Sequence, residues 1–141
     1  MSEAVIALSL LDGRTATRVD DVLSLVAADA SGQFGLLPGH APLVTVLEAG
    51  LFRYRRLGAA GWTFGACAGG TLSCRRAGRG GTEVRIVSRR FLQSAQPEAL
   101  QEQLARLLAE ESALRLSTRE SREQLDLALV RRMQELAEAA S

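Results

Sequence analysis

Residues 28–50 read ADASGQFGLLPGHAPLVTVLEAG, and this stretch decides the fold. Two apolar runs, Gly35–Leu37 and Leu43–Leu47, flank the segment 38–42, which has a proline at each end. Proline fixes φ and has no amide hydrogen to donate to a sheet, so neither proline can occupy a central strand position. Gly39 between them permits a tight turn. The stretch therefore predicts two strands joined by a rigid, exposed loop.

Outward from this stretch, the chain up to about residue 91 contains short runs rich in Val, Leu, Ile, Phe and Thr, punctuated by Gly, Asp and Pro. Side chains in residues 51–56 alternate between two faces, as half-buried strands require. Nine short strands at close spacing predict an antiparallel β-sandwich or barrel. The predicted strands are Val5–Leu11, Arg14–Val19, Val22–Ala28, Gly35–Leu37, Leu43–Leu47, Leu51–Leu57, Trp62–Ala68, Thr71–Arg75 and Val84–Val87.

The composition changes at Pro97, which suits the first position of a helix because no amide donor is needed there. Beyond it the chain has no Gly and no Pro, and the strong helix formers Ala, Leu, Glu, Gln and Arg dominate. A Ser-x-x-Glu capping box at residues 117–120 indicates a second helix start. We therefore predict helices 97–113 and 118–139, which form an antiparallel hairpin through their apolar stripes.

The linker between these predicted helices has no Gly or Pro that would break a helix. One continuous helix of about 43 residues, about 65 Å long, is therefore also sterically open. The sequence leaves both states available, with residues 114–118 as the hinge. The predicted organisation is a β-sandwich domain, residues 1–91, followed by a helical tail, residues 92–141.

The composition excludes several classes of function. A net charge of +1 provides no bulk field that would attract nucleic acid or anionic lipid. All seventeen basic residues are arginine, which excludes a phosphate-binding loop of the GxxxxGK[ST] type. No apolar run approaches the roughly 20 residues that span a bilayer, and the N-terminus lacks the basic start of a signal peptide. We expect a cytosolic protein with no nucleic-acid partner and no membrane insertion.

Cys67 and Cys74 have no His or Cys partners at the spacing of a zinc site. If Gly69-Gly70 closes a two-residue hairpin, the two cysteines are diagonal neighbours about 7–8 Å apart. That distance is too long for an unstrained disulfide. We expect two small, buried free thiols.

Residues 28–50 closely resemble the signature of epsilon subunits of bacterial F-type ATP synthases, approximately G-x-[FL]-G-[IL]-x-P-G-H-A-P-L-x-[ST]. Residues 62–72, WTFGACAGGTL, resemble the aromatic strand, Gly-Gly hairpin and return strand of the same family. The resemblance implies an N-terminal antiparallel ten-stranded β-sandwich and a C-terminal two-helix hairpin. Beyond residue 92 it is architectural only.

This resemblance implies a non-catalytic central-stalk, or rotor, subunit of a proton- or sodium-translocating synthase. In that role the sandwich couples the gamma subunit to the membrane c-ring, peripherally on the cytoplasmic face of the bacterial inner membrane. Many relatives have an acidic residue at the position of Gln33, whereas this chain is neutral there, so the resemblance does not extend to a charged contact with the ring at this position. The contact residues implied for gamma and the ring are Ser31, Gln33, Phe34, Pro38, Gly39 and His40.

The same resemblance implies that the tail reaches the catalytic alpha and beta subunits, where basic side chains meet an acidic segment and slow ATP hydrolysis. Arginine suits such contacts because its planar guanidinium binds a carboxylate through two nitrogens. The alternative is an ordinary solvated helix face. The arginines concerned are Arg115, Arg119, Arg122, Arg131 and Arg132.

Two segments depart from the family pattern. Residues 98–102 do not reproduce the Asp-x-x-Arg-Ala motif through which some relatives bind ATP, so we expect no nucleotide or other cofactor. The Gly-rich insertion at residues 75–81 favours a divergent branch, such as that of second, sodium-type synthase operons.

Two other classes of protein remain as alternatives. A free-standing β-sandwich protein-binding module with a helical dimerisation tail fits the same elements. A coiled-coil dimer should keep its a/d heptad pattern across residues 115–118, where the register is interrupted. An enzyme needs an acid, base or nucleophile constellation, and His40, the single histidine, has no nucleophile at a recognisable spacing.

Overall fold

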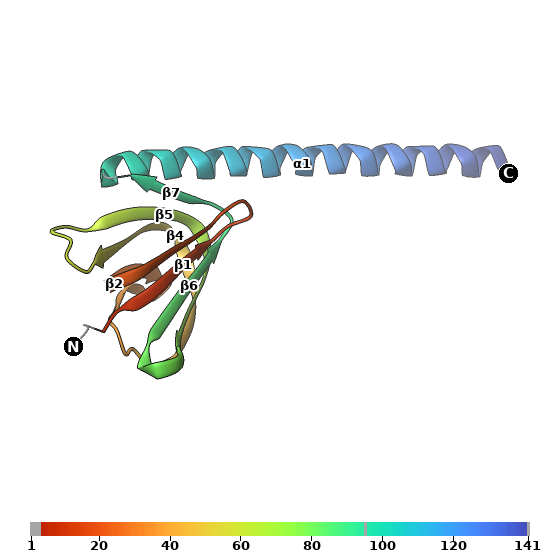
Figure 1. The fold of residues 1–141 in the computed structure, drawn as a ribbon. Coiled ribbons are helices and arrows are strands. Elements are labelled where there is room, and N and C mark those ends of the chain that lie inside the picture. Colours follow the sequence, from red (N-terminus) through yellow and green to blue (C-terminus); the bar gives the residue numbers. More distant parts are fainter. Residues whose placement is uncertain (1–3, 95, 141) are drawn as a thin grey trace. The chain divides into compact units, whose positions relative to one another are not determined.

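The computed structural model describes residues 4–94 and 96–140, and Figure 1 shows the fold. It divides into two compact units, residues 1–105 and residues 106–141, which are described separately. In chain order the elements are β1 Ile6–Leu11, β2 Ala16–Asp29, β3 Gly32–Leu36, β4 Leu43–Arg56, β5 Thr63–Arg76, the 3-10 turn η1 Gly78–Gly80, β6 Thr82–Ser88, β7 Phe91–Ser94 and α1 Pro97–Ala140.

The strands of the first unit form a closed circuit of hydrogen-bonded neighbours. Their order is β1-β6-β5-β4-β2-β3, and β1 also pairs with β2, which closes the circuit. β1 runs parallel to β6, whereas the other pairings are antiparallel. Among the described residues, β3 pairs only with β2 and β7 pairs only with β5, so these two short strands lie at edges.

Three strands, β2, β4 and β5, are each 14 residues long. The first part of β5 pairs with β7 and its second part with β6. In the same way β2 pairs first with β1 and then with β3. Each of these long strands therefore contains two neighbouring runs that the sequence analysis predicted as separate strands. The β-sandwich is confirmed, but ten strands was wrong for the described residues, which contain seven, because hydrogen bonding continues through the bends.

The predicted hairpin at Gly69-Gly70 is wrong. β5 continues through these residues along β4, where Ala68 pairs with Ala49 and Gly70 pairs with Leu47. Gly69 has a φ of +88° and Gly70 a φ of +157°, so the two residues bend the strand instead of reversing it. A Cβ atom on Gly70 would lie 2.0 Å from the carbonyl oxygen of Val87. Glycine at this position therefore allows β5 to pass close to β6.

The core of the sandwich is filled from alternate positions of the strands. Along β6, for example, Thr82, Val84, Ile86 and Ser88 are buried, and the residues between them are not. Cys67 and Cys74 are buried and free, as predicted. β7 was not predicted, because four residues give too little alternation to recognise. The fully buried large side chains in the sandwich are Ile6, Leu8, Val22, Leu25, Leu36, Leu72, Val84 and Ile86.

The tail is a single α-helix from Pro97 to Ala140, so the predicted two-helix hairpin is wrong. Pro97 is the first residue of α1, as predicted. The capping box at residues 117–120 does not start a helix. Instead, the hydroxyl of Thr118 donates a hydrogen bond to the carbonyl of Leu114 at 2.9 Å, within the continuous helix. This bond is the usual solution for a threonine inside a helix, and no Gly or Pro interrupts the neighbouring turns.

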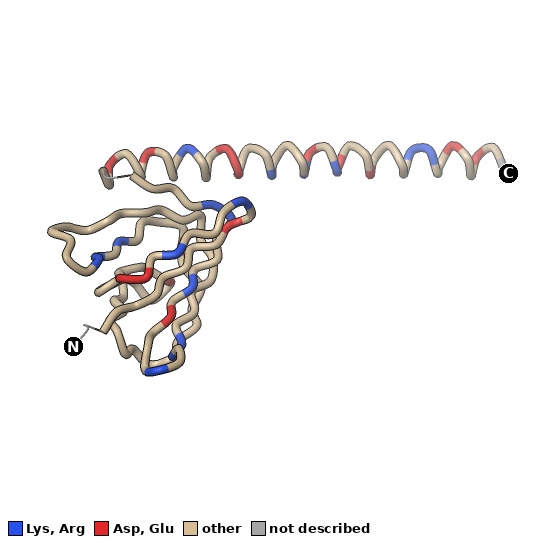
Figure 2. Tube along the Cα trace, in the orientation of Figure 1, with Lys and Arg blue, Asp and Glu red and all other residues tan. Residues whose placement is uncertain are grey.

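Burial changes along α1. Leu100 and Leu104, in the first unit, are buried. In the second unit, the large apolar side chains Leu114, Leu125, Leu129 and Met133 are more than half exposed. Acidic and basic residues lie along the whole helix (Figure 2). No helix within the described residues is both long and apolar enough to cross a membrane.

Candidate functional site

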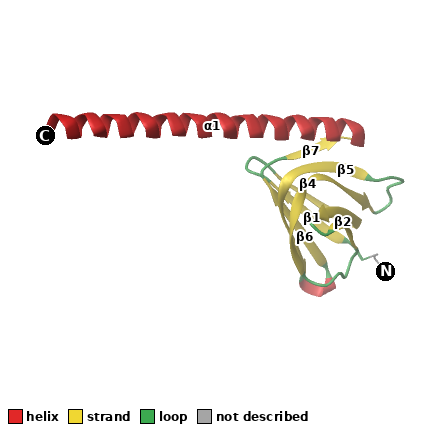
Figure 3. Cartoon of the chain, turned by 180° about the vertical axis from the view of Figure 1, so that it is seen from behind, coloured by secondary structure: helices red, strands yellow, loops and turns green. Residues whose placement is uncertain are grey.

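The loop between β3 and β4, residues 37–42, is held to the sandwich by two long-range hydrogen bonds. The weaker one runs from the thiol of Cys74 to the carbonyl oxygen of His40 at 4.0 Å. In the other, the amide of Gly39 donates to the hydroxyl of Thr82 at 2.7 Å. Thr82 is only 3% exposed and begins β6 directly after the tip of the β5–β6 hairpin, which contains η1 (Figure 3). Gly39 has a φ of +86°, which glycine adopts without strain. The loop therefore has a defined shape beside that hairpin.

His40 is fixed locally within this loop. Its amide donates to the carbonyl of Leu37 at 3.1 Å, and its Nδ1 lies 2.7 Å from the carbonyl oxygen of Ala41. A carbonyl oxygen only accepts, so Nδ1 carries the proton in this contact. The ring is half-buried, and its second nitrogen, Nε2, is not used in this contact. No three His, Cys, Asp or Glu side chains in the described ranges gather as metal ligands would.

A second polar group fixes the turn at the other end of β3. Asp29 accepts hydrogen bonds from the amide of Ser31 at 2.9 Å and from the hydroxyl of Thr45 at 2.7 Å. The Ser31 hydroxyl also donates to this carboxylate. These bonds favour the charged form, so the Ser31 and Thr45 hydroxyls and the Ser31 amide lower the pKa of Asp29. The turn that presents Gln33 is thus tied to β4.

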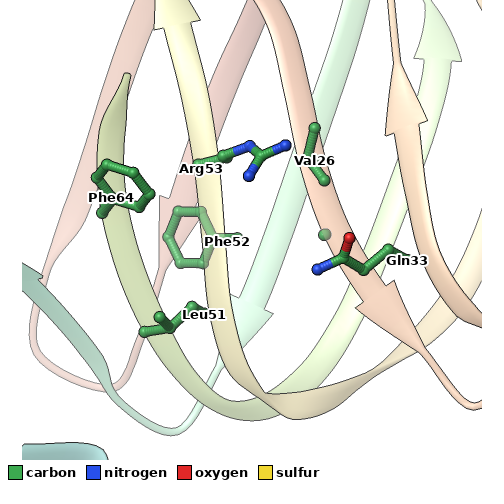
Figure 4. A pocket seen from close by; sticks show the side chains of 7 residues that line it. Val26, Gln33, Leu51, Phe52, Arg53 and Phe64 are labelled. Atoms are coloured by element: carbon green, nitrogen blue, oxygen red, sulfur yellow. The ribbon is translucent and has the colours of Figure 1, made fainter. Parts of the chain in front are cut away.

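Gln33 lines a small groove with Val26, Leu51, Arg53 and Phe64 (Figure 4). The groove lies where the register between β2 and β4 shifts, between residues 26 and 29 of β2. Its volume is about 120 Å³, well below the roughly 300 Å³ of a typical small-molecule pocket. It has room for a side chain of a partner protein.

The structure separates the predicted contact residues into two groups. Ser31 and Gln33 lie at one end of β3, and Pro38, Gly39 and His40 follow its other end. At about 3.3 Å per residue, β3 separates Gln33 from Leu36 by roughly 10 Å, and Pro38 follows in the loop. Phe34 is half-buried and packs against the core, so part of its role is structural.

An exposed apolar face, which the sequence analysis missed, adjoins the loop. Val44 and Val46 of β4 are 73% and 71% exposed, and Val87 of β6 is 47% exposed. Val46 pairs with Thr71 of β5, which in turn pairs with Val87, so these side chains form a row across three strands. We call Val44, Val46, Thr71 and Val87 the valine face. Alternation in β4 was the available signal, but it does not show which strands lie beside it.

The tail arginines do not share one face of α1. Arg115, Arg119 and Arg122 are spaced i, i+4 and i+7, which places them on one side of the helix. Arg131 lies sixteen residues after Arg115, about 160° around the axis at 3.6 residues per turn, and so faces the opposite side. Arg132 lies between these sides. Arg115 forms a loose ion pair with Glu111 at 3.9 Å.

Comparison with known proteins identifies the sandwich. The family model described as ATP synthase, Delta/Epsilon chain, beta-sandwich domain matches residues 10–91. "ATP synthase epsilon chain 2" of Cereibacter sphaeroides is 53% identical over 53 residues, which are 38% of this chain and 36% of the relative. "ATP synthase epsilon chain" of Acinetobacter baumannii is 56% identical over 32 residues, 23% of each chain. The matches to these curated relatives span less than two fifths of their length.

A solved structure supports the same fold. A chain in the cryo-EM structure of the Euglena gracilis mitochondrial ATP synthase, OSCP/F1/c-ring in rotational state 1, aligns with a TM-score of 0.58. The alignment covers 79% of this chain and 66% of that chain at 21% sequence identity. At this identity the likeness concerns the fold alone.

Proposed function

This chain belongs to the ATP synthase delta/epsilon family, and from this we propose that it is the epsilon-type subunit of an F-type synthase rotor, joining the gamma subunit to the membrane c-ring. It would contribute no catalytic group of its own. Through the complex it would lie peripherally on the cytoplasmic face of the bacterial membrane. Its coupling ion, proton or sodium, and its place in a divergent branch of the family stay predictions.

The valine face beside the 37–42 loop is the observation that carries this proposal. Contiguous exposed apolar patches are typical of surfaces that contact another protein. The face stands next to His40, whose ring is already oriented by Ala41. We assign the gamma contact to the valine face together with Pro38, Gly39 and His40.

The other end of β3 suits the second partner. Ser31 and Gln33 are exposed there, and the Gln33 groove has room for one side chain. Because β3 separates this end from the start of the 37–42 loop by roughly 10 Å, we expect the sandwich to contact two partners at once. We assign the c-ring contact to Ser31, Gln33 and the exposed edge of Phe34.

Titration of the full chain with the purified gamma subunit of its host tests the gamma contact. Val46→Asp places a charge in the centre of the valine face and should weaken binding by about tenfold or more. Leu57→Asp is the matched control, since Leu57 is also exposed but follows the opposite end of β4. The assignment fails if the wild-type chain does not bind gamma, or if both variants bind equally well.

A second proposal concerns the helix beyond residue 105. We infer that this segment contacts the catalytic alpha and beta subunits and slows ATP hydrolysis, through the face of α1 that bears Arg115, Arg119 and Arg122. Arg131 and Arg132 point elsewhere on a straight helix and would meet other surfaces. Deletion of residues 106–141 should raise ATP hydrolysis by the assembled synthase while the shortened chain still binds gamma. Unchanged hydrolysis would leave the tail without a regulatory role.

A further inference from the structure

The tip of the β5–β6 hairpin carries an excess of positive charge. Residues 75–85 contain Arg75, Arg76, Arg79 and Arg85 and one acidic residue, Glu83. Four positive charges against one negative give this hairpin +3, whereas the whole chain carries +1. Figure 2 shows the basic residues gathered at this tip. The hairpin is therefore a strongly basic segment of a nearly neutral chain, as are residues 53–56, which contain three arginines.

Glu83 neutralises only part of this charge. It lies 3.1 Å from Arg75 and 3.9 Å from Arg85 and is 16% exposed, so it is shared between two arginines at the base of the hairpin. The side chains of Arg76 and Arg79 form no ion pair or hydrogen bond with any described residue. Both are exposed. Their guanidinium groups are available to another molecule.

Arg79 occupies a backbone position that favours glycine. Its φ is +65°, and among the described residues it is the one non-glycine residue with a positive φ. Glycine stands on both sides of it, and nothing lies within 4 Å of the side-chain positions of Gly78 and Gly80. The left-handed conformation is unfavourable for an arginine relative to its usual conformations. Nothing in the packing of the tip requires this side chain, so its charge is the property to explain.

The hairpin tip adjoins the gamma contact assigned above. Thr82, which pairs with Arg76 next to the tip, accepts the hydrogen bond from Gly39 of the 37–42 loop. Cys74 of β5 pairs with Leu43, next to that loop. Arg85 pairs with Ser73, which pairs with Val44, so Arg85 stands in the same row as a residue of the valine face. Apolar side chains bordered by arginines are the usual arrangement of a protein interface.

Resting on the proposed function, we propose that Arg76 and Arg79 bind carboxylate side chains of an acidic segment of gamma, beside the surface that meets the valine face. A protein partner fits better than a nucleic acid, because the adjoining valines require apolar side chains and the charged area is small. A planar guanidinium holds a carboxylate through two hydrogen bonds, which a Lys ammonium does not do. The contact lies at the rim of the interface, so it acts chiefly on the association rate and its salt dependence.

Association of the full chain with purified gamma, measured at several salt concentrations, tests this inference. Arg76→Gln with Arg79→Gln should lower the association rate constant about three- to tenfold at roughly 0.05 M salt, and the difference should vanish near roughly 0.5 M. Arg79→Lys with Arg76 intact should retain most of the rate, because it keeps the charge. Arg14→Gln with Arg55→Gln is the control, since both arginines are exposed residues of the sandwich outside this hairpin.

The possible outcomes separate the two proposals. If wild-type chain does not bind gamma, the proposed function itself fails. If wild-type chain binds and the double variant matches it at every salt concentration, only the assignment of Arg76 and Arg79 fails. An equal loss in the Arg14/Arg55 control, or a loss that salt does not change, also overturns it. Loss of binding to anionic phospholipid vesicles with unchanged gamma kinetics would make a membrane the partner, against the proposal.

Discussion

Leu72 of β5 and Leu125 of α1 have the same side chain, yet Leu72 is fully buried and Leu125 is 66% exposed. In the sandwich, each strand obtains its backbone hydrogen bonds from other strands, so pairing brings a second layer over its apolar side. In the helix, hydrogen bonds close within four residues, and the element forms without any covering surface. Apolar patterning therefore predicts burial in the first region and only amphipathicity in the second.

Gly70→Ala should lower the stability of the sandwich more than any other substitution proposed below. A Cβ atom there would meet the Val87 carbonyl oxygen at 2.0 Å, and the φ of +157° is one that alanine rarely adopts. We expect the free energy of unfolding to fall by about 3 kcal/mol or more. Urea unfolding followed by circular dichroism measures it. Gly39→Ala, where φ is also positive but nothing lies within 4 Å, is the milder control; equal losses would contradict a steric cause.

Two leucine substitutions in α1 should differ in their effect on stability, because Leu100 lies in the first unit and Leu125 in the second. Leu100→Ala removes a fully buried side chain and should cost about 2–4 kcal/mol of unfolding free energy. Leu125→Ala should change it by less than about 0.5 kcal/mol, because that side chain is mostly exposed. Denaturant unfolding of the two variants in parallel measures both. A similar loss for both would mean that Leu125 is covered in solution.

Acid should weaken the turn that presents Gln33. Hydrogen bonds from Ser31 and Thr45 lower the pKa of Asp29 below its ordinary value of 3.8. Their contribution to stability is therefore complete above that ordinary value and disappears as the pH falls through the lowered one. Ser31→Ala with Thr45→Val should remove this part of the pH dependence below about pH 4. Melting temperatures across that range measure it, and parallel profiles for variant and wild type would count against it.

The smallest effect should come from Thr118→Ala. Alanine has the higher helix propensity, and the hydroxyl bond to Leu114 contributes nothing to the continuation of the helix. Helix content measured by circular dichroism should stay equal or rise, with a change of about 0.5 kcal/mol or less in helix stability. Thr118→Pro is the opposing control, since it removes the amide and should interrupt α1. A loss of helix in Thr118→Ala would show that the hydroxyl bond to Leu114 does support the helix.

The sandwich, its rigid 37–42 loop and the family could all be predicted from local patterns. Prolines and glycine specify a turn by their own φ preferences, and alternation of apolar residues specifies a half-buried strand. The number of strands could not be predicted in the same way. A Gly-Gly pair is compatible with a bend within one strand and with a hairpin turn between two strands. Only the pairing of β5 with Leu47 and Ala49 of β4 shows that Gly69-Gly70 forms a bend.

The candidate site also has features that the sequence predicts and features that it does not. The sequence by itself determines the helical character of the tail. It also determines which residue types form the loop and the arginine-rich hairpin. The tertiary structure alone decides that Gly39 and Thr82, 43 residues apart, join the loop to that hairpin. It also decides that Val46 and Val87 share a row across three strands. The physical reason is that turns and helices depend on neighbours in the chain, whereas a surface depends on pairings between strands that local patterns do not encode.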